Sequence, residues 1–382
     1  MKNLATLGEH ITVLSGFAFD STNFNAIDGM PIVRIRDVVP GVSKTCFRGE
    51  YDDKYLVSDG DLLVGMDGNF NRATWNGGGA LLNQRVCKLI VNPKSLHDRY
   101  LYHFLPEALQ KIEDNTPFAT VKHLSAKSIR EISIPLPPLP EQRRIASILD
   151  QADNLRAKSR HALGMLQDLA SSQFSKIIDQ SRVSDWESVP LGSISEQQGG
   201  LQVSKSRDSL QARAPYLRVA NVYRGMLSLK EIKSIGVTQT ELVRTQLRFG
   251  DLLIVEGHGN AGEIGRVAMW NADVRQMVHQ NHLIRVRVFP LRLNAKYAEA
   301  FLNSAQSIAY WQRVAKTTSG LNTINMANVR AAPILVPPLS IQNDFVARIQ
   351  DIRTVATAQE KHLASADELF ASLQYRAFRG EL

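Results

Sequence analysis

The sequence predicts a mixed α/β fold in which one unit, an α+β domain followed by a long helix, occurs twice. Three observations indicate this fold. Short motifs recur in the same order in both halves of the 382 residues, which is the signature of an internal repeat. Apolar runs of strand length are bounded by glycine-rich turns. Two long segments without proline carry apolar residues at alternating spacings of three and four, as helices do.

Four motifs carry the repeat, and their order is the same in both halves. The pairs, first copy before second, are LGEHI and LGSIS from Leu7 and Leu191, PIVRIRDV and PYLRVANV from Pro31 and Pro215, GDLLV and GDLLI from Gly60 and Gly250, and PPLPEQ and PPLSIQ from Pro137 and Pro337. Chance could produce one such pair, but it rarely preserves the order of four. We therefore expect a pseudo-two-fold repeat in the fold.

Length and composition favour a globular, cytoplasmic protein. The chain is long enough for two or three domains, because single cores stop growing at about 250–300 residues. No apolar run approaches the roughly 18 residues of a membrane span, and polar residues come too early for a signal peptide. Cys46 and Cys87 lack a metal-type spacing, so we expect both to be reduced and to serve packing.

The net charge is compatible with a phosphate-rich partner such as DNA. The sequence has 45 basic and 37 acidic residues, a net charge of +8 and a pI near 9.4, although many unrelated proteins are equally basic. Residues 1–140 hold 15 basic and 15 acidic groups, whereas residues 183–335 hold 18 and 11. If both segments bind DNA, the first must use a local patch, or a partner must supply phosphate contacts.

Gly257, Gly259 and Gly262 follow an apolar run with G-x-G-x-x-G spacing, and this spacing has two interpretations. A nucleotide cradle requires a helix directly after the glycines and an acidic residue about 20 residues further on. The sequence EIGRVAMWNAD from Glu263 instead contains strand-forming residues and then a turn. We therefore predict a strand, a glycine loop and a second strand.

The first copy of this loop, GDLLVGMDGNFNRATWNGG from Gly60, does not keep the glycine spacing. The two copies share a buried strand followed by a loop rich in glycine and asparagine. Both loops are therefore predicted to present polar side chains. These side chains are Asn69, Asn71 and Arg72 in the first copy and His258, Asn260 and Arg266 in the second.

Residues 141–182 and 337–382 are predicted to contain two helices of roughly 35 to 40 residues, which is about 55 Å at 1.5 Å per residue. Consecutive prolines cannot lie inside a helix, so PLPPLP and VPPLS are expected to be rigid joints. A narrow apolar seam this long needs a second helix; the alternative is that each helix packs only on its own domain. The residues predicted to pair are Ile145, Leu149, Leu163, Leu166, Ile349, Ile352, Leu363 and Phe370.

These segments resemble the specificity (S) subunits of Type I restriction-modification systems. PLPPLPEQRRIASILDQAD is similar to the central conserved region of that family, VPPLSIQNDFVARIQ to its distal copy, and LQYRAFRGEL to a common family terminus. The resemblance implies a first target recognition domain at 1–140, a central conserved helix at 141–182, a second target recognition domain at 183–336 and a distal conserved helix at 337–382. It also implies that the two helices form an antiparallel coiled coil. The second copy departs from the pattern at Ser340 and Ile341, where the first has Pro140 and Glu141.

The resemblance also implies the partners. They are double-stranded DNA, two methyltransferase (M) subunits and the restriction and translocase (R) subunits, with no membrane. The cofactor S-adenosylmethionine (AdoMet) then belongs to the methyltransferase subunit, and this chain needs no cofactor of its own. The alternative is a duplicated DNA-binding or interaction scaffold without a modification partner. A third hypothesis is an enzyme whose active site the sequence does not reveal.

The sequence predicts a chain without catalytic residues or a metal site. Adenine methylation requires an [N/D/S]-P-P-[Y/F/W] loop, and every Pro-Pro here is followed by leucine. Metal-dependent nucleases need clustered carboxylates with a lysine, and the DDK and EIK triplets are better explained as solvated turn charges. His279 and His282 form the only close histidine pair, with no further ligands nearby in sequence.

Asparagine, glutamine and arginine carry the donor and acceptor pairs that match adenine and guanine edges in the major groove. Arg34 and Arg36, like Arg285 and Arg287, lie two residues apart, so in a strand each pair would share a face that suits phosphates. Ordinary surface polarity is the alternative for each residue. The residues predicted to contact DNA are Arg34, Arg36, Asn69, Asn71, Arg72, Gln84, Arg85, Lys122, His123, Arg218, Asn221, His258, Asn260, Arg266, Gln280, Asn281, Asn322 and Thr323.

Overall fold

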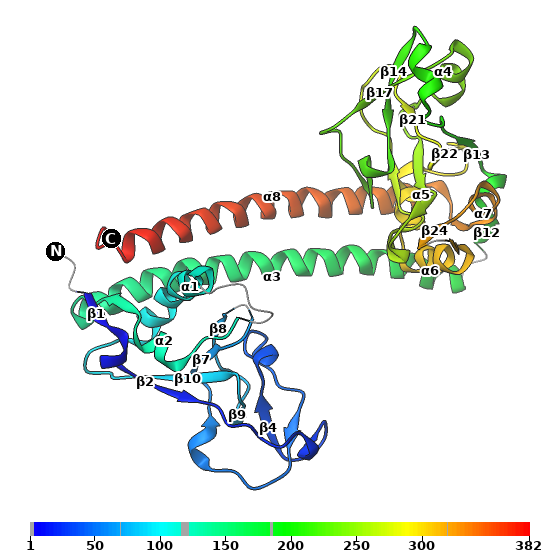
Figure 1. Ribbon diagram of the computed structural model, residues 1–382. Helices are drawn as coiled ribbons and strands as arrows, with labels where there is room; N and C mark the ends of the chain where they lie inside the picture. The colour runs from blue at the N-terminus through cyan, green and yellow to red at the C-terminus, as the bar shows by residue number, and fades with distance from the viewer. Residues whose placement is uncertain (1–3, 69, 116–121, 184–185, 319) are drawn as a thin grey trace. The chain divides into compact units, whose positions relative to one another are not determined.

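The computed structural model describes residues 4–68, 70–115, 122–183, 186–318 and 320–382 (Figure 1). The chain forms two compact units. The first unit comprises residues 1–162 and 359–382, and the second comprises residues 163–358. Each unit thus contains one α+β domain and part of both long helices. The four segments predicted from the sequence are consecutive stretches of the chain. The two compact units are defined by contacts instead, and each unit takes a part of both long helices.

The first unit has three sheets. A four-stranded sheet has the order β2-β10-β7-β8, a five-stranded sheet the order β3-β5-β4-β9-β6, and β1 pairs with β11. The strands are β1 (Leu4–Thr6), β2 (Ile11–Ser15), β3 (Phe24–Asn25), β4 (Met30–Val33), β5 (Cys46–Phe47), β6 (Leu56–Val57), β7 (Leu62–Gly65), β8 (Arg72–Thr74), β9 (Ala80–Leu82), β10 (Val86–Val91) and β11 (Ser133–Pro135). The helices are α1 (Asp98–Asn115), α2 (Ala126–Arg130), the first part of α3 (Leu139–Val183) and the last part of α8 (Leu339–Ala377), the second long helix.

The second unit repeats this plan. Its four-stranded sheet has the order β13-β22-β18-β20, a three-stranded sheet has the order β17-β14-β21, and β12 pairs with β25. A second three-stranded sheet has the order β19-β24-β23, and β15 pairs with β16. The strands are β12 (Glu187–Pro190), β13 (Ser195–Gly199), β14 (Arg213–Leu217), β15 (Val222–Tyr223), β16 (Met226–Leu227), β17 (Lys233–Gly236), β18 (Leu252–Val255), β19 (Gly257–His258), β20 (Val267–Met269), β21 (Val278–His279), β22 (Leu283–Val288), β23 (Lys316–Thr318), β24 (Leu321–Thr323) and β25 (Pro333–Val336). The helices are α4 (Gln239–Thr245), α5 (Ala295–Leu302), α6 (Ala305–Val314), α7 (Met326–Ala331), the last part of α3 and the first part of α8.

The predicted repeat extends to individual hydrogen bonds. The Gly60 amide donates to the Trp75 carbonyl at 2.8 Å, and the Gly250 amide donates to the Trp270 carbonyl at 2.9 Å. Both glycines have positive φ angles, 95° and 89°, which explains why the GDLL motif begins with glycine in both halves. The four residues of β7 and the four of β18 are all buried, as the apolar runs predict.

Gln142 and Gln342 explain why glutamine recurs after each Pro-Pro-Leu. The Gln142 Oε1 atom accepts from the His97 amide at 2.8 Å, and its Nε2 atom donates to the Ser95 and Pro137 carbonyls at 3.0 and 2.8 Å. Gln342 makes the same three bonds in the second unit, at 2.8, 3.0 and 2.7 Å. Both side chains are fully buried. Each glutamine therefore fastens the start of a long helix to its own domain.

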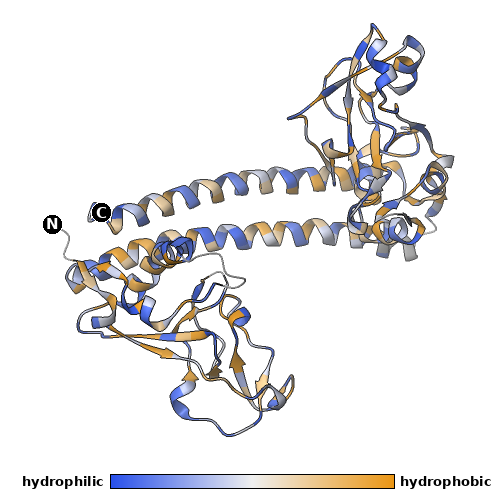
Figure 2. Ribbon diagram, in the orientation of Figure 1, coloured by the Kyte–Doolittle hydropathy of each residue, from blue (hydrophilic) through white to orange (hydrophobic). Residues whose placement is uncertain are grey.

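Parts of both long helices contact each other within each unit. In the first unit, the Arg156 Nε atom donates to the Asp367 Oδ1 atom at 2.6 Å, and Phe370 shares a core with Ile145 and Leu149. In the second unit, the Phe174 and Phe345 rings lie 5.5 Å apart. Figure 2 shows hydrophobic and hydrophilic residues alternating along both helices, as a seam requires.

The predicted pairing residues differ in burial. Ile145, Leu149 and Phe370 are at most 8% exposed, and Ile349 packs at the edge of the second core. The remaining four, Leu163, Leu166, Ile352 and Leu363, are half-buried. The ends of the helices thus pack in the cores of the units. The alternative that each helix packs only on its own domain is not what the structure shows, because the two helices also contact each other in both units.

Three further sequence predictions can be compared with the described residues. The segment after β18 contains the short strand β19, a 3-10 turn at Ala261–Glu263 and strand β20, so the G-x-G-x-x-G stretch is a strand, a loop and a strand. Cys46 and Cys87 are both free thiols. Within the described ranges, none of the helices is both long and apolar enough to cross a bilayer.

Candidate nucleic-acid interface

Three segments of the first unit meet at the carboxyl end of β7. The Leu124 amide donates to the Met66 carbonyl at 2.7 Å, and the Met66 amide donates to the Arg85 carbonyl at 2.8 Å. These backbone bonds bring together the segments of five polar residues, which we call the first corner, although the Lys122 Nζ atom donates to the Glu113 carbonyl at 2.6 Å. The first corner consists of Asp67, Gln84, Arg85, Lys122 and His123. Four of the five are predicted DNA-contacting residues.

Asp67 orients the two cationic or ionisable side chains of the first corner. Its Oδ2 atom lies 3.0 Å from the Arg85 Nη1 atom, and its Oδ1 atom lies 2.6 Å from the His123 Nδ1 atom. The Arg85 and His123 side chains remain 54% and 51% exposed. Arg85 has a φ angle of 73°, which is uncommon for arginine and is found at functional sites. The guanidinium is thus held in one place while much of it faces solvent.

The second unit builds an equivalent corner with the same backbone bonds. The Ile324 amide donates to the Glu256 carbonyl at 2.9 Å, and the Glu256 amide donates to the His282 carbonyl at 3.0 Å. The resulting group of side chains is called the second corner. It consists of Glu256, His258, Asn281, His282, Asn322 and Thr323. Four of these are predicted DNA-contacting residues, so the sequence named residues that the fold places at matching positions.

Internal hydrogen bonds preorganise the second corner. The Asn322 Nδ2 atom donates to the His258 and Gly259 carbonyls at 3.3 and 3.2 Å, and the Thr317 Oγ1 atom donates to the Asn322 Oδ1 atom at 2.9 Å. The Asn260 amide donates to the His258 Nδ1 atom at 3.0 Å, which fixes that nitrogen as an acceptor. Asn260 itself is exposed at the tip of the loop.

Gln84 and Asn281 occupy matched positions in the two corners. The Gln84 amide donates to the Phe17 carbonyl at 2.8 Å, and the Asn281 amide donates to the Leu201 carbonyl at 2.9 Å. Gln84 is exposed and Asn281 is half-buried, so their carboxamide groups are available at equivalent places. Gln280, the neighbour of Asn281, is also half-buried.

Three of the predicted contact residues have internal roles in this structure. Arg72 donates through Nε to the Tyr102 carbonyl and lies 3.8 Å above the Tyr102 ring, and burial lowers its pKa. Asn221 is 3% exposed and accepts from the Arg218 amide at 2.9 Å. Arg266 is 8% exposed and donates to the Val219 carbonyl at 3.1 Å. We therefore leave these three out of the candidate interface.

The paired-arginine prediction is corrected by the fold. Strand β4 ends at Val33 and a 3-10 turn spans Ile35–Asp37, so Arg34 and Arg36 do not share a strand face. Arg34 is bonded to Thr45, whereas the Arg36 side chain is 69% exposed. Arg218, the counterpart of Arg34 before the second 3-10 turn, pairs with Glu231 at 3.2 Å.

Arg285 and Arg287 do lie on one strand, β22, but both side chains bond internally. Arg285 donates to the Arg244 carbonyl at 3.1 Å, and Arg287 forms two 2.7 Å bonds with Asp251. Neither pair therefore forms the predicted phosphate-binding face. Asn71 is half-buried beside Gly65, and Asn69 lies outside the described residues.

Sequence reasoning missed Asp67, Glu256 and Phe17. Phe17 is 48% exposed beside Gln84, and its ring lies 5.2 Å from that of Tyr55. The glycine that precedes this segment, Gly16 in the first unit and Gly200 in the second, is a sequence feature that could have indicated the corner. A Cβ atom on Gly16 would lie 2.0 Å from the Asn83 carbonyl oxygen, and one on Gly200 would lie 2.2 Å from the Gln280 carbonyl oxygen. Glycine is therefore required at this crossing in both units.

The chain matches the Type I restriction modification DNA specificity domain family over residues 3–163 and 183–365. It is 30% identical to the specificity subunit of the Type I restriction enzyme EcoBI from Escherichia coli, an alignment that covers 97% of this chain and 84% of that protein. It belongs to this family. The EcoKI specificity subunit from Escherichia coli strain K12 is 26% identical over 99% of this chain and 89% of its own length.

Solved structures show the same fold for this specificity subunit. The S subunit of a Type I system from M. genitalium superimposes with a TM-score of 0.61 at 14% identity, covering 99% of this chain and 96% of that one. A chain from a study of complex assembly in the type I R-M system gives 0.56 at 17% identity, covering 100% and 98%. The prediction of a recognition subunit in place of an enzyme is confirmed by the family.

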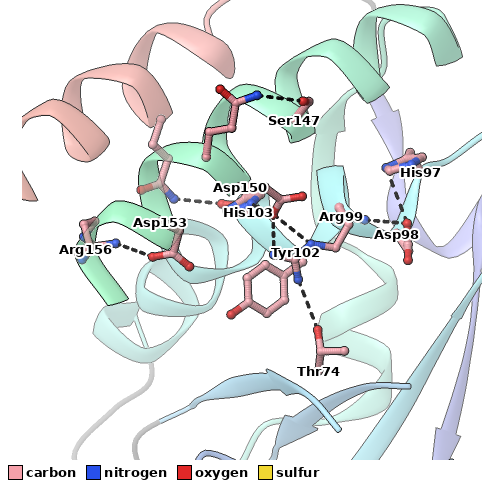
Figure 3. A network of polar contacts seen from close by, with 12 residues as sticks. Thr74, His97, Asp98, Arg99, Tyr102, His103, Ser147, Asp150, Asp153 and Arg156 are labelled. Carbon is pink, nitrogen blue, oxygen red and sulfur yellow. Dashed lines mark hydrogen bonds and ion pairs between the residues drawn. The ribbon is translucent and has the colours of Figure 1, made fainter. Parts of the chain in front are cut away.

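One polar network in the specificity subunit superficially resembles a catalytic site. His103 on α1 is fully buried, and its Nε2 atom lies 2.7 Å from the Asp150 Oδ1 atom on α3 (Figure 3). Arg99 also pairs with Asp150, and burial lowers the pKa of His103 despite this carboxylate. Because the His103 side chain has no exposed surface, the network joins α1 to α3 and does not present a base to a substrate.

Proposed function

We propose that this specificity subunit recognises a bipartite DNA target, with one corner contacting each half-site. The observation that carries the proposal is the duplication of the corner by identical backbone bonds to Met66 and Glu256. Equivalent frames holding different side chains are what a protein needs to contact two different short sequences. The chain then directs methyltransferase and restriction subunits to that target.

The side chains of the corners fit base edges. Arginine bonds guanine O6 and N7 in a bidentate manner, and asparagine or glutamine bonds adenine N6 and N7. Arg85 and Gln84 offer these groups in the first corner, and Asn281 offers one in the second. The short distances within each corner support preorganisation, because a side chain fixed before binding loses less entropy on contact.

We further propose that α3 and α8 form an antiparallel coiled coil that fixes the separation of the two half-sites. Contacts inside each unit support this proposal. Arg144 donates to the carbonyl of Leu382 at 2.7 Å, and Arg156 pairs with Asp367, so residue numbers rise on one helix as they fall on the other. The contact between Phe174 and Phe345 in the second unit fits the same antiparallel direction.

The partners follow from the family. We propose two methyltransferase subunits, because the chain offers two equivalent units, together with restriction subunits that act on the same DNA. AdoMet binds the methyltransferase subunit in this scheme. Among the described residues, no group of three or more histidine, cysteine, aspartate or glutamate side chains has metal-binding geometry. We propose that the complex acts in the cytoplasm, where both DNA and AdoMet are accessible to it.

Sequencing of methylated adenines tests the proposal. The chain would be reconstituted with its cognate methyltransferase subunit, incubated with DNA of random sequence and AdoMet, and the methylated positions mapped. We expect one motif with two short specified parts separated by an unspecified spacer. Methylation without a motif, or a motif with one uninterrupted part, would contradict the proposal, and omission of this chain is the control that should abolish specific methylation.

A further inference from the structure

A second surface of unit two combines large exposed apolar side chains with unpaired cations. The side chains of Phe249, Phe289 and Leu291 are 77%, 41% and 88% exposed. Phe249 and Pro290 line a cavity of about 580 Å³. We call Phe249, Phe289, Pro290 and Leu291 the apolar patch. Phe289 and Leu291 do not line this cavity but flank Pro290 in the chain. Single exposed apolar residues are ordinary, but several of them at and beside a hollow indicate an interaction surface.

The charge of this cavity has one sign. Arg248, Arg287 and Lys296 line it, and no carboxylate does so among its lining residues. Arg287 is neutralised by Asp251. Arg248 and Lys296 are exposed, and neither forms an ion pair with any residue that the structure describes. Two free cations therefore border the apolar patch.

The equivalent positions of the first unit, all among the described residues, carry other side chains, although the backbone there is equivalent. The matched bonds of Gly60 and Gly250 place Asp59 where the second unit has Phe249. The Leu96 amide donates to the Asn92 carbonyl at 2.9 Å and the Leu293 amide to the Phe289 carbonyl at 3.0 Å. Asn92 thus corresponds to Phe289, and Lys94 to Leu291. Because one copy of the fold forms without these apolar residues, the fold does not require them in the other.

We propose that the apolar patch binds an acidic, amphipathic segment of a protein partner, once per chain. This inference rests on the proposed function, since the partner is a protein subunit of the same assembly. DNA would be attracted by Arg248 and Lys296 but would gain little from Phe249 and Leu291. A segment with glutamate or aspartate beside large apolar side chains satisfies both features, because interface cores favour aromatic anchors and charged rims favour complementary charge.

Site-specific photocrosslinking tests the proposal in the full assembly. The variant Phe249→p-benzoylphenylalanine would be reconstituted with the cognate methyltransferase and restriction subunits and DNA, irradiated, and the products identified by mass spectrometry. We expect a cross-link to one acidic segment of one partner subunit. The matched controls are Asp59→p-benzoylphenylalanine, at the equivalent place in the first unit, and Val243→p-benzoylphenylalanine, which is 67% exposed on α4. Neither control should label that segment.

Several outcomes would overturn the proposal. They are labelling at Phe249 no greater than at Val243, equal labelling of the same segment from Asp59, and cross-links to DNA or to a second copy of this chain. Motif-specific methylation is measured in the same samples. If methylation is intact and the cross-link is absent, the patch inference fails alone; if methylation is absent with the wild-type chain, the proposed function fails.

A charge graft provides the second measurement. The double variant Phe249→Asp and Leu291→Lys gives the second unit the residues of the first. We expect it to weaken binding of the cross-linked partner by about tenfold or more, with an unchanged methylation motif and an unchanged far-UV circular dichroism spectrum. The control is Val243→Asp. Equal affinities for the graft, the control and the wild-type chain would reject the patch as a docking site.

Discussion

In the first corner the carboxylate of Asp67 contacts both an arginine and a histidine, whereas in the second corner the carboxylate of Glu256 lies 3.8 Å from His282 and the remaining contacts are made by amides, hydroxyls and backbone carbonyls. Asp67 holds Arg85 by an ion pair at 3.0 Å and His123 by a hydrogen bond at 2.6 Å. Asn322 holds the loop of His258 through neutral hydrogen bonds. The backbone bonds beneath both corners are the same. The comparison teaches that the duplicated scaffold fixes where the corner lies, while the side chains in it are free to differ.

The largest expected effect concerns that shared scaffold. Gln142→Ala would leave the His97 amide and two carbonyls without partners in a buried place, at a cost of about 4 kcal/mol in the free energy of unfolding. Gln342→Ala should cost the same in the second unit. Calorimetry would measure both, with hydrogen exchange to assign each transition to a unit. Gln151→Ala, exposed on α3, is the control. If only one of the two variants lost stability, the two glutamines would not have equivalent roles in the two units.

The second prediction concerns a buried histidine that only the second unit has at this position. Burial lowers the pKa of His279 to about 4; the counterpart in the first unit is Leu82, because it pairs with Val33 as His279 pairs with Leu217. Since the folded-state pKa lies below the unfolded value, the unfolded chain binds more protons between pH 6.5 and 4. The free energy of unfolding should therefore fall by about 3 kcal/mol as pH falls through this window.

Hydrogen exchange in β22 would measure this effect, because it reports the second unit by itself. His279→Leu should be less stable at pH 7 but should lose most of the pH dependence between 6.5 and 4. His103 in the first unit also has a lowered pKa, so a whole-chain measurement would mix the two groups. An unaltered slope for β22 in His279→Leu would show that other groups cause the acid sensitivity.

Local patterns in the sequence were sufficient to predict the buried strands and the long helices that both units share. Runs of three and four apolar residues after GD predicted β7 and β18, and the prolines before each long helix predicted where α3 and α8 begin. The role of Gln142 was not predictable, because its partners lie 45 and 47 positions away. A repeated glutamine marked the position, and only the fold explained the reason.

The sequence predicted the types of residue in the candidate site, but it predicted only partly which positions form that site. Arg85 and His123 were named, but the Asp67 that joins them is 56 positions from His123. Asn221 and Arg266 have the same chemistry and are buried, since polarity alone does not tell whether a side chain caps a turn or faces solvent. Long-range pairing decides this, and one sequence does not contain it in readable form.

The third prediction compares the matched carboxamides. Gln84→Ala should weaken or relax recognition of the first half-site by about 1–3 kcal/mol, and Asn281→Ala should do the same for the second, because each removes one base contact. Binding to targets mutated in each half-site, at one stated salt concentration, would separate the two. Gln110→Ala, exposed on α1, is the control. If both variants affected the same half-site, the corners would not divide the target between them.

The smallest effect is expected at the 3-10 turns that follow β4 and β14. Arg34 and Arg218 occupy the same place before the turn, so Arg36 corresponds to Ala220. Arg36 is 69% exposed and reaches Asp37 only at 4.0 Å, which leaves it available to a phosphate. Arg36→Ala should weaken DNA binding uniformly over sequences, by less than about 1 kcal/mol, and reduce the slope of log K against log salt by about 1.

Ala220→Arg is the reciprocal change and should raise the same slope by about 1 if the second turn faces the backbone as the first does. Methylation motifs should stay unchanged in both variants, because phosphate contacts carry no sequence information. A salt slope that changes for Arg36→Ala alone would show that only the first turn approaches the phosphates. That result would fit the charge distribution, since residues 1–140 have no basic excess and depend more on each exposed arginine.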